Sequence, residues 1–351
     1  MNILFLYSRL SAHSYSMIND VALNPTVKKV VCLYRDDYNY FDLRKLNEGS
    51  VIFLHDKDIQ ADIFDHYFNG EAPNIIYVSG WSNKKYVYHL ALWRFKNLLN
   101  STKVVCGIDD QWKGSAKQWI GRQFRFVIGW LYDIAWVAGS RQYYYSKMMG
   151  FKLSIPFLLS GSSKIFKYTD KHANRFIFIG RDDPVKGLEL LMEAFTIFNQ
   201  SFSDYELIII GPDGSNISEK YTKKCNNIFY RGFLTSENIQ KELLLGGVGV
   251  IPSTKEQWGV VIHEFCLAGL PVIATKECGA SEDLVINKMN GFVVETGSIE
   301  GLVNAMKNLA EMNNDEIFRL KGNSAILGSR YSSTLTVNSL ISCVKKNDTY
   351  N

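Results

Sequence analysis

The chain has 351 residues, of which 46% are hydrophobic and 21% charged, with a net charge of +4. This length favours two domains, because a single hydrophobic core rarely serves so long a chain, and the composition excludes disordered, collagen-like and low-complexity proteins. The basic residues gather in residues 1–165, which hold 20 Lys and Arg against 13 Asp and Glu, whereas residues 166–351 hold 19 against 22. The net charge is small and no recognition motif is present, so a nucleic-acid partner is not expected.

No apolar run approaches the roughly 18 residues that span a bilayer. Residues Met1–Tyr7 indicate a short buried strand rather than a signal peptide, so we expect a cytoplasmic protein. The 6 cysteines are scattered and show no C-x-x-C spacing. Neither disulfides nor a structural zinc site is therefore expected.

Short apolar runs alternate with helical patterns along the whole chain. In the first half they predict strands at Ile3–Tyr7, Val30–Tyr34, Val51–Leu54, Ile75–Val78, Lys103–Cys106 and Ile134–Ala138, with a helix at Lys84–Leu99. In the second half they predict strands at Phe176–Ile179, Leu207–Ile210, Ile228–Tyr230, Val248–Ile251, Val272–Ala274 and Phe292–Val294. This alternation predicts the α/β class, with parallel sheets covered by helices on both faces.

A polar break separates the two halves. Ser160-Gly161-Ser162-Ser163 and the polar stretch Lys167–Asn174 indicate a linker, which gives domains at 1–165 and 166–329. Ligands of doubly wound sheets bind outside the carboxyl ends of the strands, so two such domains are expected to face each other across one cleft. A last helix is predicted at Ser329–Val344, and residues 330–351 are expected to pack back on the first domain.

The segment 112–130 combines basic and aromatic residues and contains no acid. Its members are Lys113, Lys117, Arg122 and Arg125 with Trp112, Trp119, Phe124, Phe126 and Trp130. A face of this kind is typical of a surface that meets anionic lipid or a phosphorylated acceptor. The alternative is a solvated helix whose aromatic residues lie in the core beneath it.

A phosphate-binding pattern follows the strand predicted at Phe176–Ile179. Gly180 frees the backbone at the end of the strand, Arg181 offers a planar fork of donors, and Lys186 adds a mobile charge just before a helix. The first strand is followed by Ser8–His13 without G-x-G-x-x-G, and no G-x-x-x-x-G-K-[ST] is present. Nicotinamide oxidoreductases and P-loop kinases are therefore disfavoured.

Two carboxylates, Glu256 and Glu264, lie eight positions apart across a predicted junction between a loop and a helix. The helix is expected to start near Gly259, where free backbone N–H groups and the positive end of the helix dipole attract an anion. Glu256 is expected in the loop and Glu264 about one turn into the helix. Neither carboxylate belongs unpaired in an apolar core.

Two adjacent acids, Asp109 and Asp110, follow the strand predicted at Lys103–Cys106. Acids at the end of a strand predict a side chain that lines the ligand cleft, although the residues alone do not choose between the two. The alternative is a cap at the start of a helix at Gly114–Tyr132.

Further motifs complete an ordered series: Arg231-Gly232-Phe233, Pro252-Ser253, Ala268-Gly269-Leu270-Pro271-Val272, Gly279-Ala280-Ser281-Glu282 and Asn290-Gly291-Phe292-Val293. Together with the motifs at 180–187 and 256–264, this series resembles the family 4 retaining glycosyltransferases of GT-B fold. The resemblance covers residues 175–330 strongly and residues 1–165 only in their alternation of strands and helices. It implies two facing, doubly wound Rossmann-like domains.

The resemblance also implies roles by position. Arg181 and Lys186 match the pair that binds the donor diphosphate, Glu264 the residue that holds the donor ribose, and Glu256 the residue that reaches the transferred sugar. The backbone of the next group is implied to lie beside the sugar and phosphates: Trp258, Gly259, Val260 and Val261. The nucleotide base is implied to pack near Tyr230–Leu234, which includes Arg231.

The activity implied is that of a metal-independent, retaining hexosyltransferase without a cofactor, whose donor is a UDP- or GDP-linked sugar. The D-x-D letters Asp56-Lys57-Asp58 lie in the first half, away from the donor motifs. A glycan or lipid-linked saccharide is the implied acceptor, as in O-antigen or capsule-like polysaccharide synthesis, with peripheral contact to the anionic inner face of the cytoplasmic membrane. The alternative is a non-catalytic sugar-nucleotide-binding subunit of a polysaccharide-assembly complex, which would be expected to have lost Glu256 or the basic pair.

Overall fold

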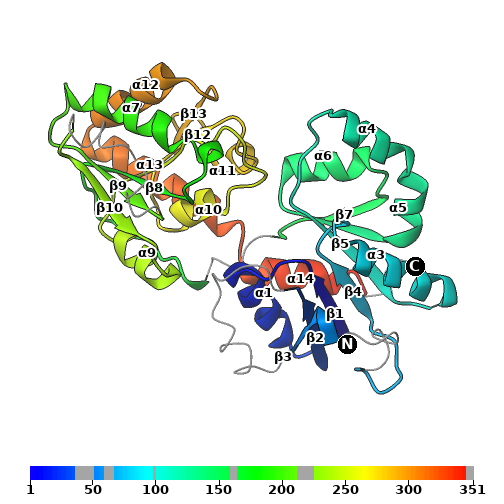
Figure 1. Cartoon of the computed structure of the whole chain (residues 1–351). Coiled ribbons are helices and arrows are strands. Elements are labelled where there is room, and N and C mark those ends of the chain that lie inside the picture. Colours follow the sequence, from blue (N-terminus) through cyan, green and yellow to red (C-terminus); the bar gives the residue numbers. More distant parts are fainter. Residues whose placement is uncertain (36–50, 59–66, 98–99, 159–163, 212–224, 345–351) are drawn as a thin grey trace, which may run out of the picture. The chain divides into compact units, whose positions relative to one another are not determined.

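The structure is a computed structural model that describes residues 1–35, 51–58, 67–97, 100–158, 164–211 and 225–344 (Figure 1). The chain divides into two compact units, one formed by residues Met1–Gly161 and Ser332–Asn351, the other by Ser162–Tyr331. Below they are called unit 1 and unit 2. The linker predicted at Ser160–Ser163 lies outside the described residues.

Unit 1 is built on a parallel sheet. Its described strands are β1 (Asn2–Tyr7), β2 (Lys29–Tyr34), β3 (Val51–His55), β4 (Ile75–Val78), β5 (Lys103–Ile108), β6 (Ile134–Val137) and β7 (Leu153–Ile155). They form a 7-stranded sheet in the order β3-β2-β1-β4-β5-β6-β7. The sequence predicted all of these strands except β7, a 3-residue strand at the edge of the sheet.

Residues of the strands β1 to β6 enter two separate cores, one on each face of the sheet. Leu4 and Leu6 of β1 pack with the helices α3 (Lys84–Lys96), α5 (Arg125–Leu131) and α6 (Ser140–Met148). Ile3 and Phe5 pack with α1 (Ala12–Ala22) and α14 (Ser333–Ser342). Helices thus cover both faces of the sheet, as the near-continuous apolar strands require. The last described helix therefore belongs to unit 1, and it begins at Ser333 rather than at the predicted Ser329.

Unit 2 repeats the architecture with a second parallel sheet. Its described strands are β8 (Arg175–Ile179), β9 (Glu206–Ile210), β10 (Ile228–Gly232), β11 (Val248–Ile251), β12 (Val272–Thr275) and β13 (Gly291–Val294). They form a 6-stranded sheet in the order β10-β9-β8-β11-β12-β13. Each of them overlaps a strand that the sequence predicted, which confirms the expectation of parallel α/β domains.

The helices of unit 2 also cover its sheet. On one face α7 (Leu188–Asn199) and α12 (Ile299–Ala310) share a core with the strand residues Phe176 and Phe178. A second pair of helices in unit 2, α10 (Val260–Leu267) and α13 (Asn314–Ser329), pack against each other. Their approach is close, because a Cβ atom at Gly328 would lie 2.7 Å from the backbone nitrogen of Leu267.

The strand orders identify where ligands bind in sheets of this kind. In unit 2 the chain runs outward from β8 through β9 to β10 and then returns to place β11 on the other side of β8. In unit 1 the same reversal lies between β1 and β4. A crevice opens outside the carboxyl ends of the strands at such a switch point.

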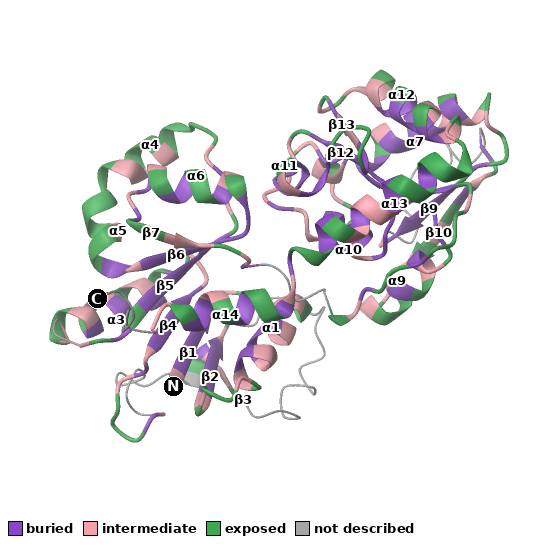
Figure 2. Ribbon diagram, turned by 180° about the vertical axis from the view of Figure 1, so that it is seen from behind, coloured by how far each residue is buried: buried purple, intermediate pink, exposed green. Residues whose placement is uncertain are grey.

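The segment that follows β5 differs from its prediction. The single helix expected over Gly114–Tyr132 is two helices, α4 (Ala116–Gln123) and α5, which meet at Phe124. Four of the five aromatic side chains in 112–130, Trp119, Phe124, Phe126 and Trp130, are exposed, in line with the exposed colouring of α4 and α5 in Figure 2, whereas Trp112 packs against the core. The alternative of aromatic core positions beneath a solvated face is therefore wrong for the rings of α4, α5 and their junction. In the part of the chain that the structure describes, no helix is long and apolar enough to cross a membrane.

Candidate functional site

The loop after β8 carries the first part of the candidate site. Asp183 begins a short 3-10 helix, Pro184–Lys186, and its carboxylate accepts a hydrogen bond from the Val185 N–H at 3.1 Å. Gly187 follows with φ +71°, and a Cβ atom there would lie 2.2 Å from the carbonyl oxygen of Pro252. Only glycine fits this position without a shift of the backbone. The loops after β8 and β11 therefore lie in direct contact.

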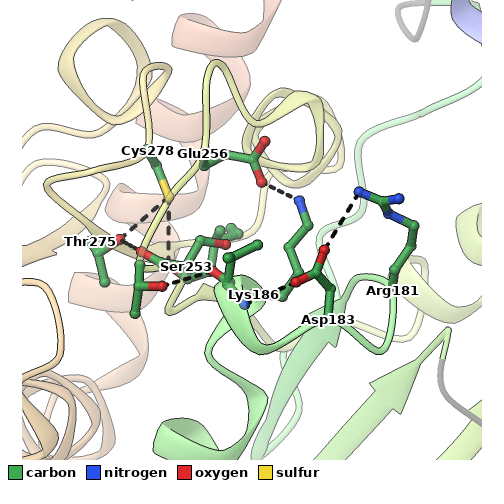
Figure 3. Close-up of polar contacts among 10 residues, drawn as sticks. Arg181, Asp183, Lys186, Ser253, Glu256, Thr275 and Cys278 are labelled. Carbon is green, nitrogen blue, oxygen red and sulfur yellow. Dashed lines mark hydrogen bonds and ion pairs between the residues drawn. The ribbon is translucent and has the colours of Figure 1, made fainter. Parts of the chain in front are cut away.

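An ion pair joins these two loops. The ammonium group of Lys186 donates to Oε2 of Glu256, as the close-up in Figure 3 shows. The two side chains are 20% and 19% exposed, so solvent screens the pair less than it screens a surface pair. The Thr254 N–H also donates to the carbonyl of Val185 at 2.8 Å. A cation and a carboxylate are thus held together at the switch point between β8 and β11.

The start of α10 lies next to Glu256. Gly259 caps the helix with φ +95°, and a Cβ atom there would lie 3.2 Å from Cγ of Glu256. Val260 and Val261 are the first residues of the helix, where N–H groups have no carbonyl partner within the helix. Such a helix start attracts an anion through its N–H groups and its dipole.

The side chains of Glu264 and Trp258 are buried, with 4% and 2% of their surface exposed. Glu264 lies on α10, in the position that the sequence predicted. The ring of Trp258 packs against Tyr331 at 5.6 Å between centroids, and its carbonyl accepts a hydrogen bond from the Ala280 N–H at 2.7 Å. Trp258 therefore fixes the loop and can offer a ligand only its backbone.

The end of β12 and the loop that follows it support the loop after β11. Thr275 donates its hydroxyl to the carbonyl of Ser253 at 2.5 Å, and the Cys278 thiol donates to the carbonyl of Ile251 at 3.8 Å (Figure 3). Burial raises the pKa of Cys278 to about 11, so the thiol stays protonated at neutral pH. The sequence analysis missed Thr275 and Cys278, because nothing in their local pattern shows which distant carbonyl they contact.

Two predicted arginines differ in their surroundings. Arg181 is exposed and lies 4.0 Å from the Asp183 carboxylate, in the loop that holds Lys186. Gly180 precedes it, and a Cβ atom there would lie 2.7 Å from the ring of Phe178. Arg231 lies on the edge strand β10, where it pairs with Glu242 at 3.4 Å. The structure therefore places Arg181 in the loop that carries Lys186 and pairs Arg231 with Glu242 instead.

Asp109 and Asp110 follow β5 in unit 1. The pKa of Asp109 is raised, mainly because the protein around it limits its hydration, although the side chain still reaches solvent; its own backbone N–H opposes this rise and Asp110 adds to it. The Asp110 carboxylate accepts a hydrogen bond from the Gln111 N–H at 3.0 Å. Ser115 caps α4, so the alternative of a helix cap at Asp109 or Asp110 is wrong.

Of the histidines, His13 is uncharged at neutral pH and His263 has a structural role. Poor hydration lowers the pKa of His13, on α1, to about 4, so its ring is neutral at pH 7. His263, beside Glu264, is buried and its Nε2 lies 3.0 Å from the carbonyl oxygen of Gly328. Among the described residues, no group of three or more His, Cys, Asp or Glu side chains is placed to hold a metal ion.

Comparison with known proteins finds a family match in the second half of the chain. Residues 163–321 match the family model described as glycosyl transferases group 1. A Klebsiella pneumoniae protein named for its cps region is 27% identical over 136 residues, or 39% of this chain and 37% of the relative. An uncharacterised glycosyltransferase of Methanocaldococcus jannaschii is 27% identical over 203 residues, or 54% of this chain and 52% of the relative. The matches thus span about half or less of these curated relatives.

The solved structures extend the likeness to the whole fold. Anabaena HepE in complex with UDP and glucose superimposes with a TM-score of 0.73, covers 98% of this chain and 99% of its own, and is 16% identical. At that identity the likeness establishes the fold alone. Residues 163–321 therefore match the group 1 glycosyl transferases in sequence, and the chain has the two parallel-sheet α/β domains of the GT-B fold.

Proposed function

We propose that the protein is a retaining glycosyltransferase of the family 4 type. In this proposal it moves a sugar from a UDP- or GDP-linked donor to a glycan or lipid-linked saccharide, in the synthesis of a capsule- or O-antigen-like polysaccharide. The observation that carries the proposal is the Lys186–Glu256 ion pair, which lies at the switch point of unit 2 beside the start of α10. The relative from a cps region and the HepE complex with UDP and glucose support the substrate class.

The proposed donor site is assembled to hold a diphosphate. Lys186 pairs with Glu256 beside the helix start, and Arg181 stands in the same loop as Lys186. When the bond to the sugar breaks, negative charge develops on the leaving diphosphate. The Lys186 ammonium and the N–H groups of Val260 and Val261 supply a field that is in place before this charge appears, which is how preorganised donors lower such barriers.

Glu256 and Lys186 neutralise each other in the protein without donor. In the proposed complex, the diphosphate replaces Glu256 as the partner of Lys186, and the Glu256 carboxylate accepts hydrogen bonds from hydroxyls of the transferred sugar. Glu264 then holds the donor ribose. The exchange keeps every charge partnered, which matters because an unpaired charge in a partly buried site is unfavourable.

Retention places the incoming and leaving oxygens on the same face of the sugar. In the proposed mechanism the departing diphosphate accepts the proton of the acceptor hydroxyl, so no protein nucleophile is assigned. The stabilising charge comes from Arg181, Lys186 and the start of α10, and the proposal includes no cofactor. We propose that Asp109 of unit 1 contacts either the transferred sugar or the acceptor hydroxyl.

The test is turnover across a panel of UDP- and GDP-linked sugars, each with lipid-linked and free glycan acceptors. We expect at least one donor to release its nucleoside diphosphate with transfer of the sugar, and NMR of the product to show the anomeric configuration of the donor. An inverted product would contradict retention. Binding of a donor without transfer or hydrolysis to any acceptor would instead favour the non-catalytic binding subunit.

A further inference from the structure

An exposed apolar surface runs over three neighbouring helices of unit 1. We call it the aromatic–basic surface, and its apolar members are Leu92, Phe95, Trp119, Ile120, Phe124, Phe126, Val127 and Trp130. They come from α3, α4, α5 and the junction between α4 and α5, and α5 contacts both other helices. Figure 2 shows α4 and α5 as largely exposed. Phe95 and Phe126 are 72% and 77% exposed, which is unusual for large rings.

Packing within unit 1 covers these side chains only in part, since Trp119 meets the ring of Trp112 edge-on at 5.3 Å between centroids and is still 47% exposed. All 8 residues of α4 are described and none is buried. The helix is held instead by its ends: Ser115 and Gln118 form a capping box, and the Gln118 amide donates to the carbonyl of Gln111 at 2.7 Å. Short helices in proteins are normally stabilised by a buried apolar face. The apolar face of α4 points outward, where a partner can bury it.

The same surface is rich in basic residues, of which Arg94 on α3 is paired with Asp133 at 2.5 Å. The sequence has no Asp or Glu in 84–108 or in 111–132, and the basic residues there are Lys84, Lys85, Arg94, Lys96, Lys103, Lys113, Lys117, Arg122 and Arg125. Two guanidinium groups lie over exposed rings, Arg122 at 5.1 Å from the centroid of Trp119 and Arg125 at 5.2 Å from that of Phe126. Each of these cations is therefore presented together with a ring.

We propose that the aromatic–basic surface docks unit 1 on an anionic lipid bilayer. Trp and Phe rings favour the boundary between headgroups and acyl chains, and Lys and Arg beside them are attracted to lipid phosphates. Charge complementarity selects the occupant, because residues 111–132, which supply most of this surface, contain four cations and no acid. The inference goes beyond the proposed function, because the docking surface needs no nucleotide and lies on unit 1, whereas the proposed donor loops lie on unit 2.

The experiment measures co-sedimentation of the full chain with sucrose-loaded vesicles, made either of phosphatidylcholine alone or of equal parts phosphatidylcholine and phosphatidylglycerol. The test variant is Arg125→Gln with Phe126→Ser. The matched control is Phe318→Ser with Arg319→Gln, which removes an exposed ring and its neighbouring exposed arginine from α13 of unit 2. Circular dichroism confirms that both variants fold.

We expect the wild-type chain and the control to bind the anionic vesicles and to lose binding as salt rises. The test variant should bind about tenfold more weakly, because one cation near the membrane surface contributes about fivefold and the ring adds to it. Brominated lipids should quench the fluorescence of the wild type more than that of a Trp119→Phe, Trp130→Phe variant.

Three results would overturn the inference. They are no preference for anionic vesicles, equal binding by the test variant and the wild type, and a defect shared by the control. Retention on single-stranded nucleic acid at equal charge density, or self-association that the test variant abolishes, with no vesicle binding, would assign the surface to another partner. A chain that binds vesicles but turns over no donor would leave this inference intact and contradict the proposed function.

Discussion

The carboxyl ends of the two sheets have the same topology and different chemistry. In unit 2, Lys186 and Glu256 flank the switch point. In unit 1, the strands beside the switch point, β1 and β4, carry Tyr7 and Tyr77. Their rings are tilted against each other at 5.1 Å between centroids, and burial raises both of their pKa values, so both stay neutral. The comparison teaches that one fold presents an ion pair at the switch point of unit 2 and two buried, neutral tyrosines beside the switch point of unit 1.

The largest expected effect on sugar transfer tests the Lys186–Glu256 pair of unit 2. Lys186→Ala should lower transfer about a hundredfold, since the loss of one preorganised donor to a leaving group costs about 3 kcal/mol. Steady-state kinetics with the donor found in the panel measures the effect.

Lys276→Ala is the matched control, because Lys276 also pairs with a glutamate, Glu295, but both side chains are well exposed, at 58% and 70%. We expect this control to keep the wild-type rate within a factor of two. Equal losses in the two variants would show that Lys186 has no special role.

Gly187→Ala tests whether the contact between the loops after β8 and β11 is needed for the stability of unit 2. A side chain at φ +71° costs roughly 1–2 kcal/mol, and the clash with Pro252 should add about 2 kcal/mol. Gly297→Ala isolates the first effect, because Gly297 has φ +78° and nothing within 4 Å of a Cβ atom. Urea unfolding should show the larger loss for Gly187→Ala, and equal losses would contradict the tight contact.

Asp109→Asn tests the edge of unit 1. We expect about a tenfold loss of transfer, the size of a lost hydrogen bond to a charged group. Because the pKa of Asp109 is raised, the wild-type rate should fall as the pH drops through that raised value, and the variant should lose this acid limb. Asp110→Asn serves as the control and should retain the wild-type pH profile. A loss confined to Asp110→Asn would reverse the assignment.

The smallest expected effect is on the pH dependence of folding stability, and it concerns a buried cation on α13. Lys321, on α13, is 1% exposed and donates to the carbonyl of Lys171 at 2.8 Å, and burial lowers its pKa to about 8. Between that value and the ordinary pKa of lysine, the unfolded chain binds more protons than the folded one, so stability rises with pH in this window. The stability of the wild type relative to Lys321→Met should increase by about 1 kcal/mol from pH 7 to pH 9. A difference independent of pH would contradict the lowered pKa.

Most strands of both sheets could be predicted from the sequence, because buried parallel strands are nearly continuous apolar runs. It missed β7, where only 3 residues pair at the edge of the sheet and Leu153 is exposed. It could not show that Arg231 pairs with Glu242, since that contact depends on how α9 (Ser236–Leu243) packs. Nor could periodicity tell whether the rings of α4 and α5 meet a core or remain outside, because an apolar stripe has the same spacing in both cases.

The most direct test of the central claim is a crystal structure with the nucleoside diphosphate of the preferred donor. We expect the diphosphate within hydrogen-bonding distance of the Lys186 ammonium and of the N–H groups of Val260 and Val261, with Glu256 released from Lys186. A nucleotide bound elsewhere, with the Lys186–Glu256 pair intact, would contradict the account.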